Sequence, residues 1–239
     1  MDKQRALVSR VSADVAAHLE QKDWARTLVA ATGQPLTPRT IMNVPEPGQK
    51  QELTNQVCLV IDCSNSMSRK DKMQQARRGA LHFAREALSK GYLIGLIGFA
   101  SDAMQLRGPK ENLDEIRQVL AGMKAGKGST NMAVAIRLAR GQLSHARGER
   151  VMCIVTDGQP DSDREALAEA EEAKGFGMGI ITLGTDDADK AFLERLASCC
   201  TLSAKVASHE LERGMLNMAR LLPMLPAPGR GVTPRLAGH

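Results

Sequence analysis

Residues 57–66 read Val-Cys-Leu-Val-Ile-Asp-Cys-Ser-Asn-Ser, an apolar run that ends in a carboxylate and two hydroxyls. The leading residues are apolar without a break, which is typical of a strand buried on both faces of a parallel sheet. Asp62, Ser64 and Ser66 then occupy alternate positions in the segment that leaves the strand, so their oxygens can converge on one point. Three such oxygen donors suit a small divalent cation. The same residue types also cap helices, and these three positions alone do not separate the two interpretations.

The composition indicates one α/β domain with additional segments. The chain has 239 residues, of which 43% are hydrophobic but only 3% aromatic, so its core must consist of Ala, Val, Ile, Leu and Met. Its net charge is +5, yet residues 51–223 hold 23 Lys and Arg against 22 Asp and Glu. This near neutrality, and the absence of aromatic residues among the charges, argue against nucleic-acid binding through the basic termini and through Arg77, Arg78 and Arg85. We expect those three arginines to point outward from the helix of residues 69–90.

We expect a soluble cytoplasmic protein with reduced thiols. Met1 is followed by charged residues rather than an apolar signal core, and no apolar run reaches the length of a membrane span. The cysteines are odd in number and form no CxxC pair, which argues against disulfides and against a zinc site. We expect all five to be core thiols: Cys58, Cys63, Cys153, Cys199 and Cys200.

The chain divides into three segments. Residues 1–50 combine helical spacing with four prolines between positions 35 and 47, which predicts a helical and extended arm. This arm either packs on the main domain or docks a partner. Residues 51–222 alternate strand and helix patterns and form the main domain. Residues 223–239 are rich in Pro and Gly and predict a flexible tail without core-forming potential.

Six apolar runs in the main domain predict strands, and the segments between them predict helices. The expected strands are 57–61, 92–99, 104–107, 151–155, 178–183 and 201–206. The expected helices are 69–90, 112–121, 130–146, 161–174, 189–198 and 209–222. This alternation predicts a doubly wound, mostly parallel six-stranded sheet of Rossmann-like order 3-2-1-4-5-6, with helices on both faces and a short third strand at the edge.

The predicted topology brings a second carboxylate to the first. Strands 1 and 4 are neighbours in this order, and ligands bind in the crevice at their carboxyl ends. Strand 1 ends at Asp62, and strand 4 ends just before Asp157. Thr130 opens the helix that leads into strand 4, where its hydroxyl is either a helix cap or a further oxygen donor. The candidate metal ligands are therefore Asp62, Ser64, Ser66, Thr130 and Asp157.

In their contexts DCSNS, GST and TDG, these residues resemble the pattern of von Willebrand factor A (VWA) domains that carry a complete metal-ion-dependent adhesion site (MIDAS). That pattern is D-x-S-x-S after the first strand, a Thr before a later helix and an Asp after the fourth strand. The resemblance covers about residues 54–222. It implies Mg²⁺ or Mn²⁺, with the two serines and often the threonine touching the metal, and the two aspartates often acting through water.

Binding, not catalysis, is the expected function. Neutral hydroxyls beside Mg²⁺ leave the cation incompletely neutralised, with a coordination position that an Asp or Glu carboxylate of a partner protein can fill. The resemblance implies an AAA+ ATPase of the MoxR or chelatase kind as one class of partner. We therefore expect an intracellular adaptor or scaffold that is not an enzyme. The basic residues flanking the loops form either a positive rim or ordinary solvated charge: Arg69, Lys70, Lys124 and Lys127.

The alternative is a metal-dependent hydrolase or phosphotransfer enzyme that uses the same oxygens. Such an enzyme needs a base or nucleophile in the crevice, and all five histidines fall on predicted helices or termini. Cys63 lies beside the metal loop, but strand alternation directs its side chain away from the predicted metal.

Overall fold

The computed structural model of the chain describes residues 54–126, 128–186 and 188–223. All the described residues belong to the unit that begins at Glu52. The predicted arm, and all of the predicted tail except Pro223, lie outside the described residues.

Six strands form one sheet in the order β3-β2-β1-β4-β5-β6. The central strand β1 pairs in parallel with β2 and β4, β5 is parallel to β4 and β6, and β3 runs antiparallel to β2 at one edge. The strands are β1 (Asn55–Asp62), β2 (Tyr92–Phe99), β3 (Ala103–Lys110), β4 (Arg150–Thr156), β5 (Gly179–Thr185) and β6 (Ser203–Val206). The predicted mostly parallel α/β fold is confirmed, strand order included.

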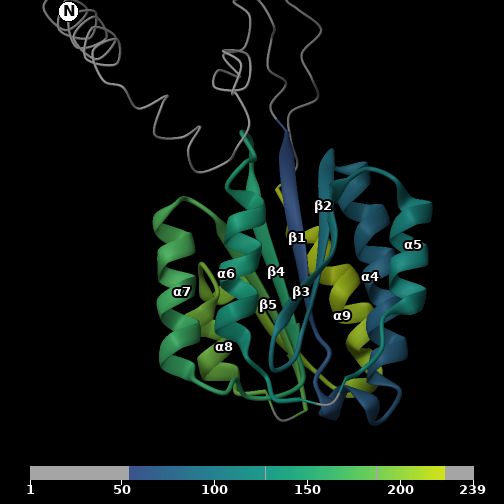
Figure 1. The fold of residues 1–239 in the computed structure, drawn as a ribbon, viewed down its shortest axis with the longest axis vertical. Coiled ribbons are helices and arrows are strands. Elements are labelled where there is room, and N and C mark those ends of the chain that lie inside the picture. Colours follow the sequence, from purple (N-terminus) through teal and green to yellow (C-terminus); the bar gives the residue numbers. More distant parts are fainter. Residues whose placement is uncertain (1–53, 127, 187, 224–239) are drawn as a thin grey trace, which may run out of the picture. The chain divides into compact units, whose positions relative to one another are not determined.

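Helices cover both faces of this sheet (Figure 1). One face carries α4 (Lys72–Ser89), α5 (Leu113–Gly122) and α9 (Leu211–Arg220). The other carries α6 (Met132–Leu143), α7 (Asp163–Gly175) and α8 (Lys190–Leu196). Short 3-10 turns connect some of these elements: η1 (Asn65–Ser68), η2 (Cys200–Leu202) and η3 (Ser208–Glu210). No helix among the described residues is both long enough and apolar enough to cross a bilayer.

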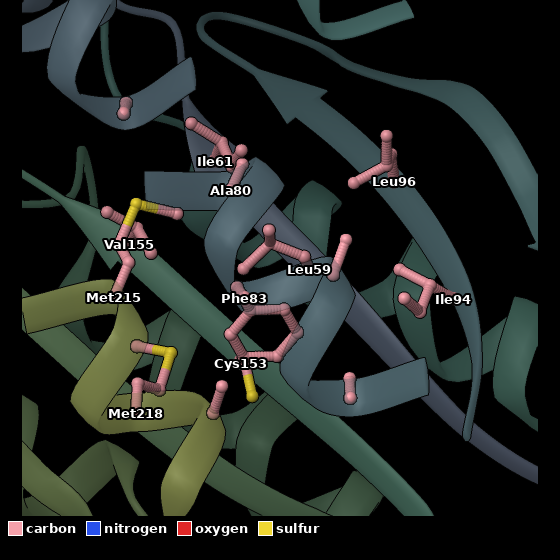
Figure 2. Close-up of a cluster of buried hydrophobic side chains, with 14 of the residues drawn as sticks. Leu59, Ile61, Ala80, Phe83, Ile94, Leu96, Cys153, Val155, Met215 and Met218 are labelled. Carbon is pink, nitrogen blue, oxygen red and sulfur yellow. The ribbon is translucent and has the colours of Figure 1, made fainter. Parts of the chain in front are cut away.

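The alternation of β1 supplies both hydrophobic cores. Val57, Leu59 and Ile61 belong to the cluster beneath α4 and α9, whereas Cys58 and Val60 belong to the cluster beneath α6. All five are buried, as expected for a strand covered on both faces. Figure 2 shows the first cluster, in which side chains of α4 and α9 meet those of three strands. The side chains labelled there are Leu59, Ile61, Ala80, Phe83, Ile94, Leu96, Cys153, Val155, Met215 and Met218.

Two elements differ from their expected bounds for identifiable reasons. The helix expected from residue 69 begins at Lys72, because Lys70 and Asp71 adopt left-handed φ values of 52° and 54°. The strand expected at 104–107 extends over Ala103–Lys110. The sequence Gly108-Pro109 signals a break, but an edge strand tolerates proline, since one side of its backbone needs no strand partner.

Three side-chain predictions are corrected as well. Arg77, expected to point outward, is partly buried and donates a hydrogen bond to the carbonyl oxygen of Met123. The nucleic-acid interpretation, which the composition already disfavours, therefore loses one of its three arginines. Cys199 and Cys200 are exposed rather than core thiols, because they lie in the turn before β6. All the cysteines are free.

Candidate metal site at the carboxyl ends of β1 and β4

Asp62 is the last residue of β1 and is fully buried. Its Oδ1 accepts a hydrogen bond from the backbone N–H of Ser64 at 2.8 Å, and its Oδ2 accepts one from the Thr156 hydroxyl at 2.7 Å. Burial raises the pKa of the Asp62 carboxyl, and the hydrogen bonds from Ser64 and Thr156 oppose this shift. The carboxylate is fixed in orientation, and a nearby cation would stabilise its charged form.

The hydroxyls of the loop after β1 connect to the carboxylate that follows β4. Ser64 Oγ lies 3.0 Å from Ser66 Oγ, and Ser66 Oγ donates a hydrogen bond of 2.7 Å to Asp157 Oδ1. Asp157 is 1% exposed and Ser64 is 2% exposed, while Ser66 is partly accessible. The parallel pairing of β1 with β4 places these groups together, because both strands end at the same edge of the sheet.

The helix-capping interpretation of these residues is wrong for α4. The N-cap of that helix is Asp71, ten residues from the end of the first predicted strand. Ser64 occupies the N-cap position of η1, but its side chain makes no capping hydrogen bond there. The Ser64 hydroxyl therefore faces the other oxygens instead of the helix backbone.

Thr130 lies beside the same cluster without bonding to it. A Cβ atom built on Gly158 would lie 3.9 Å from Thr130 Oγ1, which places this hydroxyl next to the residue that follows Asp157. Among the described contacts, it makes no hydrogen bond to the other four predicted ligands. Thr130 is also not the helix cap, since Asn131 holds that position and its side chain accepts a hydrogen bond from Val134 N–H.

Asp161 positions Thr130 and was not identified from the sequence as part of this site. Its Oδ1 accepts a hydrogen bond from the backbone N–H of Thr130 at 2.9 Å, and its Oδ2 accepts one from Ser129 Oγ at 2.6 Å. Ser162 is the N-cap of α7, and its side chain accepts a hydrogen bond from the backbone N–H of Glu165, which leaves the Asp161 carboxylate available to the Thr130 loop.

Lys72 is the second residue that sequence reasoning missed. Its side chain is only 4% exposed, and its Nζ lies 2.5 Å from Asp157 Oδ2 and 2.9 Å from Asp186 Oδ2. Burial opposes the charged form of Lys72, but hydrogen bonds to Asp157 and Asp186 and the charges of both carboxylates raise its pKa above the usual lysine value. A lysine at the start of a helix is normally expected to be exposed to solvent, so only the tertiary contacts of Lys72 show that it is buried and paired with two carboxylates.

The oxygen spacing fits a small octahedral cation. Two oxygens bound at right angles to one Mg²⁺, each about 2.1 Å from it, lie about 3.0 Å apart. The pairs Ser64–Ser66 and Ser66–Asp157 are separated by 3.0 and 2.7 Å. Within the described residues, no group of three or more His, Cys, Asp or Glu side chains is placed to hold a metal ion. Any site here is therefore of the mixed hydroxyl and carboxylate type, and coordination by these residues stays a prediction.

The expected positive rim is reduced by pairing. Arg69, Lys70 and Lys124 are exposed near the loops, while Lys127 lies outside the described residues. Lys70 Nζ is 3.5 Å from Asp186 Oδ2, so part of its charge is already balanced. Cys63, as expected, packs against the core rather than entering the oxygen cluster.

The fold is the α/β fold of VWA domains, a class that consists mostly of interaction and adhesion modules. Residues 57–159 match the family model of the von Willebrand factor type A domain. That range begins in β1 and ends just after the β4 carboxylate, so it includes all five predicted ligands. The match supports a VWA domain in this part of the chain.

Two curated relatives share this region. The human (Homo sapiens) calcium-activated chloride channel regulator 4 is 30% identical over 149 residues, which cover 58% of this chain and 16% of that protein. The bovine (Bos taurus) calcium-activated chloride channel regulator 1 is 27% identical over 189 residues, which cover 73% of this chain and 20% of that protein. The match thus spans a fifth or less of the length of either relative.

Solved structures support the fold. Proximal thread matrix protein 1 from the mussel byssus, in a structure with a zinc-occupied MIDAS motif, gives a TM-score of 0.62 at 16% identity over 70% of this chain and 47% of that one. The vWF domain of the type V pili tip protein Mfa5 from Porphyromonas gingivalis gives 0.63 at 13% identity over 70% and 94% of the two chains. At these identities, the likeness establishes the fold alone.

Proposed function

We propose that the described domain is a metal-dependent protein-binding module. In this proposal, Ser64 and Ser66 hold Mg²⁺ or Mn²⁺ together with Asp62, Asp157 and Thr130, and the bound cation captures an Asp or Glu carboxylate of a partner. The observation that carries the proposal is the continuous chain from Ser64 Oγ to Ser66 Oγ to Asp157 Oδ1, with separations of 3.0 and 2.7 Å.

The chemistry of the donor set favours binding over turnover. Hydroxyl oxygens are neutral ligands, so a Mg²⁺ ion that they hold keeps most of its charge for an incoming anion. Ser66 is partly accessible, which leaves a route to the ion from solvent. A partner carboxylate bound at the edge of a buried cluster is less screened than one on an open surface.

The partner and the location are the finer parts of the proposal. A protein with an exposed Asp or Glu is the required chemistry, and an AAA+ ATPase of the MoxR or chelatase kind is the first such partner to test. An intracellular location goes with that partner. The curated relatives are named as chloride channel regulators, but the match covers at most 20% of their length and so supports a shared domain rather than a shared role.

Metal binding tests the site directly. Ser66→Ala removes an oxygen that touches both Ser64 and Asp157, so we expect it to weaken Mg²⁺ and Mn²⁺ binding in calorimetry by at least about tenfold. Ser68→Ala is the matched control, because Ser68 Oγ lies in the same loop but donates to the carbonyl oxygen of Asn65. Equal affinities of the two variants for both metals would contradict the proposed site.

Partner capture tests the function. The full chain, immobilised, should retain an acidic partner from a lysate in Mg²⁺ and release it in EDTA, and Ser66→Ala should retain none while keeping its circular dichroism spectrum. Purified AAA+ ATPases of the MoxR kind can be tested in the same format. Phosphodiesterase or ATPase turnover by the purified chain that disappears in Asp62→Ala would instead favour the metal-dependent enzyme.

A further inference from the structure

Lys72 places a positive charge inside the candidate metal site. It is the first residue of α4, and the left-handed residues Lys70 and Asp71 precede it. Its Nζ lies 2.5 Å from Asp157 Oδ2. A buried ammonium is tolerated when carboxylates pair with it, and a buried carboxylate equally needs a cation or donors.

Asp157 is shared between this ammonium and the hydroxyl cluster. Its Oδ1 accepts the hydrogen bond from Ser66, and its Oδ2 accepts the one from Lys72. The negative charge of Asp157, which a divalent cation would otherwise offset, is therefore partly offset from within the chain. The same pairing reduces, without removing, the repulsion between the Asp62 and Asp157 carboxylates.

A second carboxylate gives the ammonium another partner. Asp186, in the segment after β5, lies 2.9 Å from Lys72 Nζ through its Oδ2. Its Oδ1 accepts a hydrogen bond from the Ser208 hydroxyl, which fixes the carboxylate in place. If Asp157 turned its charge toward a metal, Lys72 would remain paired with Asp186 rather than being left alone in the protein interior.

Building on the proposed function, we propose that Lys72 is a tethered counter-cation that competes with the divalent ion for Asp157 and thereby sets the cation affinity of the site. Metal binding is then an exchange, in which the Lys72 ammonium passes from shared contact with Asp157 and Asp186 to contact with Asp186. Two consequences follow: the site stays assembled without metal, and its affinity for metal is lower than the oxygen donors alone would give.

Lys70 provides the matched control on the same loop. Its Nζ lies 3.5 Å from Asp186 Oδ2, but its side chain is 69% exposed. Within the part of the chain that the structure describes, it forms no ion pair with Asp157. Removing its charge lowers the net charge by the same single unit without vacating a position at Asp157. A general charge effect would therefore appear in both variants, and a competition effect only in the Lys72 variants.

The experiment compares Mg²⁺ and Mn²⁺ dissociation constants of the full chain by calorimetry for the wild type, Lys72→Gln, Lys72→Met and Lys70→Gln. We expect both Lys72 variants to bind about tenfold to a hundredfold more tightly than the wild type, because a like charge next to the ion is removed, and Lys70→Gln to stay within about twofold. Thermal unfolding in parallel should show a larger Mg²⁺-induced rise of Tm in the Lys72 variants. Lys72→Met keeps the aliphatic stem and so preserves most of the buried packing.

The outcomes separate this inference from the proposed function. Unchanged or weaker metal binding in both Lys72 variants overturns the inference, and Ser66-dependent binding by the wild type would leave the proposed function standing. Binding by the Lys72 variants but not by the wild type supports the inference. Variants that fold only in Mg²⁺ also support it, whereas variants unfolded with and without Mg²⁺ overturn it. Absence of binding in every protein overturns both.

Discussion

At the scale of single residues, Thr156 supplies the hydrogen bond that stabilises the buried carboxylate of Asp62. The Thr156 hydroxyl donates to Asp62 Oδ2 at 2.7 Å from the neighbouring strand, and both residues are fully buried. A carboxylate oxygen that loses its donor inside a protein retains its full desolvation cost. The contact between β1 and β4 therefore has a polar component in addition to the ladder between the strands.

Thr156→Val should lower the free energy of unfolding by about 1–3 kcal/mol, because it leaves Asp62 Oδ2 without its donor and the Gly158 N–H without its acceptor while preserving the side-chain shape. Urea unfolding at pH 7 measures the change. Thr182→Val is the control: Thr182 is 1% exposed on a strand, and its hydroxyl contacts the neutral Leu193 carbonyl oxygen and Ser203 Oγ. Each hydroxyl thus has neutral contacts as well, those of Thr156 being with Gly158, and equal losses in the two variants would contradict a larger cost at the charged Asp62.

The sequence predicted which oxygen-bearing side chains lie together only for residues at or near the ends of strands. A parallel sheet places the carboxyl ends of its strands at one edge, so the sequence predicts that four of the residues lie close together: Asp62, Ser64, Ser66 and Asp157. The position of Lys72 could not be predicted in this way, since its burial depends on Asp157 and on Asp186, which comes more than a hundred residues later. Only the folded chain distinguishes such a lysine from a solvated one.

At the scale of elements, the packing of α4 on α9 depends on a glycine. A Cβ atom on Gly79 would lie 2.7 Å from Met215 Sδ, 3.0 Å from Met215 Cβ and 3.1 Å from Glu212 Cα. The sulfur can move, but the other two atoms move only with the α9 backbone. The two helices therefore approach each other more closely than any residue with a side chain at position 79 would allow.

Gly79→Ala should destabilise the domain by about 1–3 kcal/mol, because overpacking exceeds the gain in helix propensity. Gly141→Ala is the matched control in α6, where a Cβ atom would meet nothing within 4 Å. That variant should be neutral or more stable by up to about 1 kcal/mol. Urea unfolding of both proteins measures the difference. A stabilised Gly79→Ala variant would contradict the prediction, because it would mean that α9 moves away from the new Cβ atom without losing packing energy.

The elements themselves were largely predictable, with errors where local and tertiary signals conflict. The helix expected at 112–121 forms as α5, with Asn112 accepting hydrogen bonds from the N–H groups of Asp114 and Glu115. The edge strand extends further than expected, and Pro109 is tolerated within it because one side of an edge strand needs no strand partner. The start of α4 was misplaced because no sequence rule indicates left-handed conformations at Lys70 and Asp71.

At the scale of the whole molecule, the sheet couples the two cores. One cluster lies beneath α4 and α9 and the other beneath α6 and α8, and β1 and β4 contribute side chains to both. Loss of either cluster would expose the central strands, so we expect the domain to unfold cooperatively. A local electrostatic change at the edge of the sheet should then appear in global unfolding.

Asp186 provides such a change. The hydrogen bond from Ser208, followed by that from Lys72, lowers the pKa of the Asp186 carboxyl to about 2. Because the folded-state pKa lies below the unfolded value of about 4, the ionised carboxylate stabilises the fold above about pH 4, and this contribution disappears as the pH falls from about 4 to 2. The raised pKa of Asp62 acts in the opposite direction, since its protonation in acid relieves the cost of a buried charge.

Asp186→Asn should therefore reduce the free energy of unfolding at pH 7 by about 1 kcal/mol, a value that allows for solvent screening at this partly exposed group. Its stability should also fall less steeply than that of the wild type between pH 4 and pH 2, because the group that loses its charge in that range is gone. Urea unfolding at a series of pH values measures both effects, with Asp71→Asn at an exposed residue as the control. Parallel pH profiles for the wild type and Asp186→Asn would mean that the contacts of Asp186 with Lys72 and Ser208 do not favour its charged form.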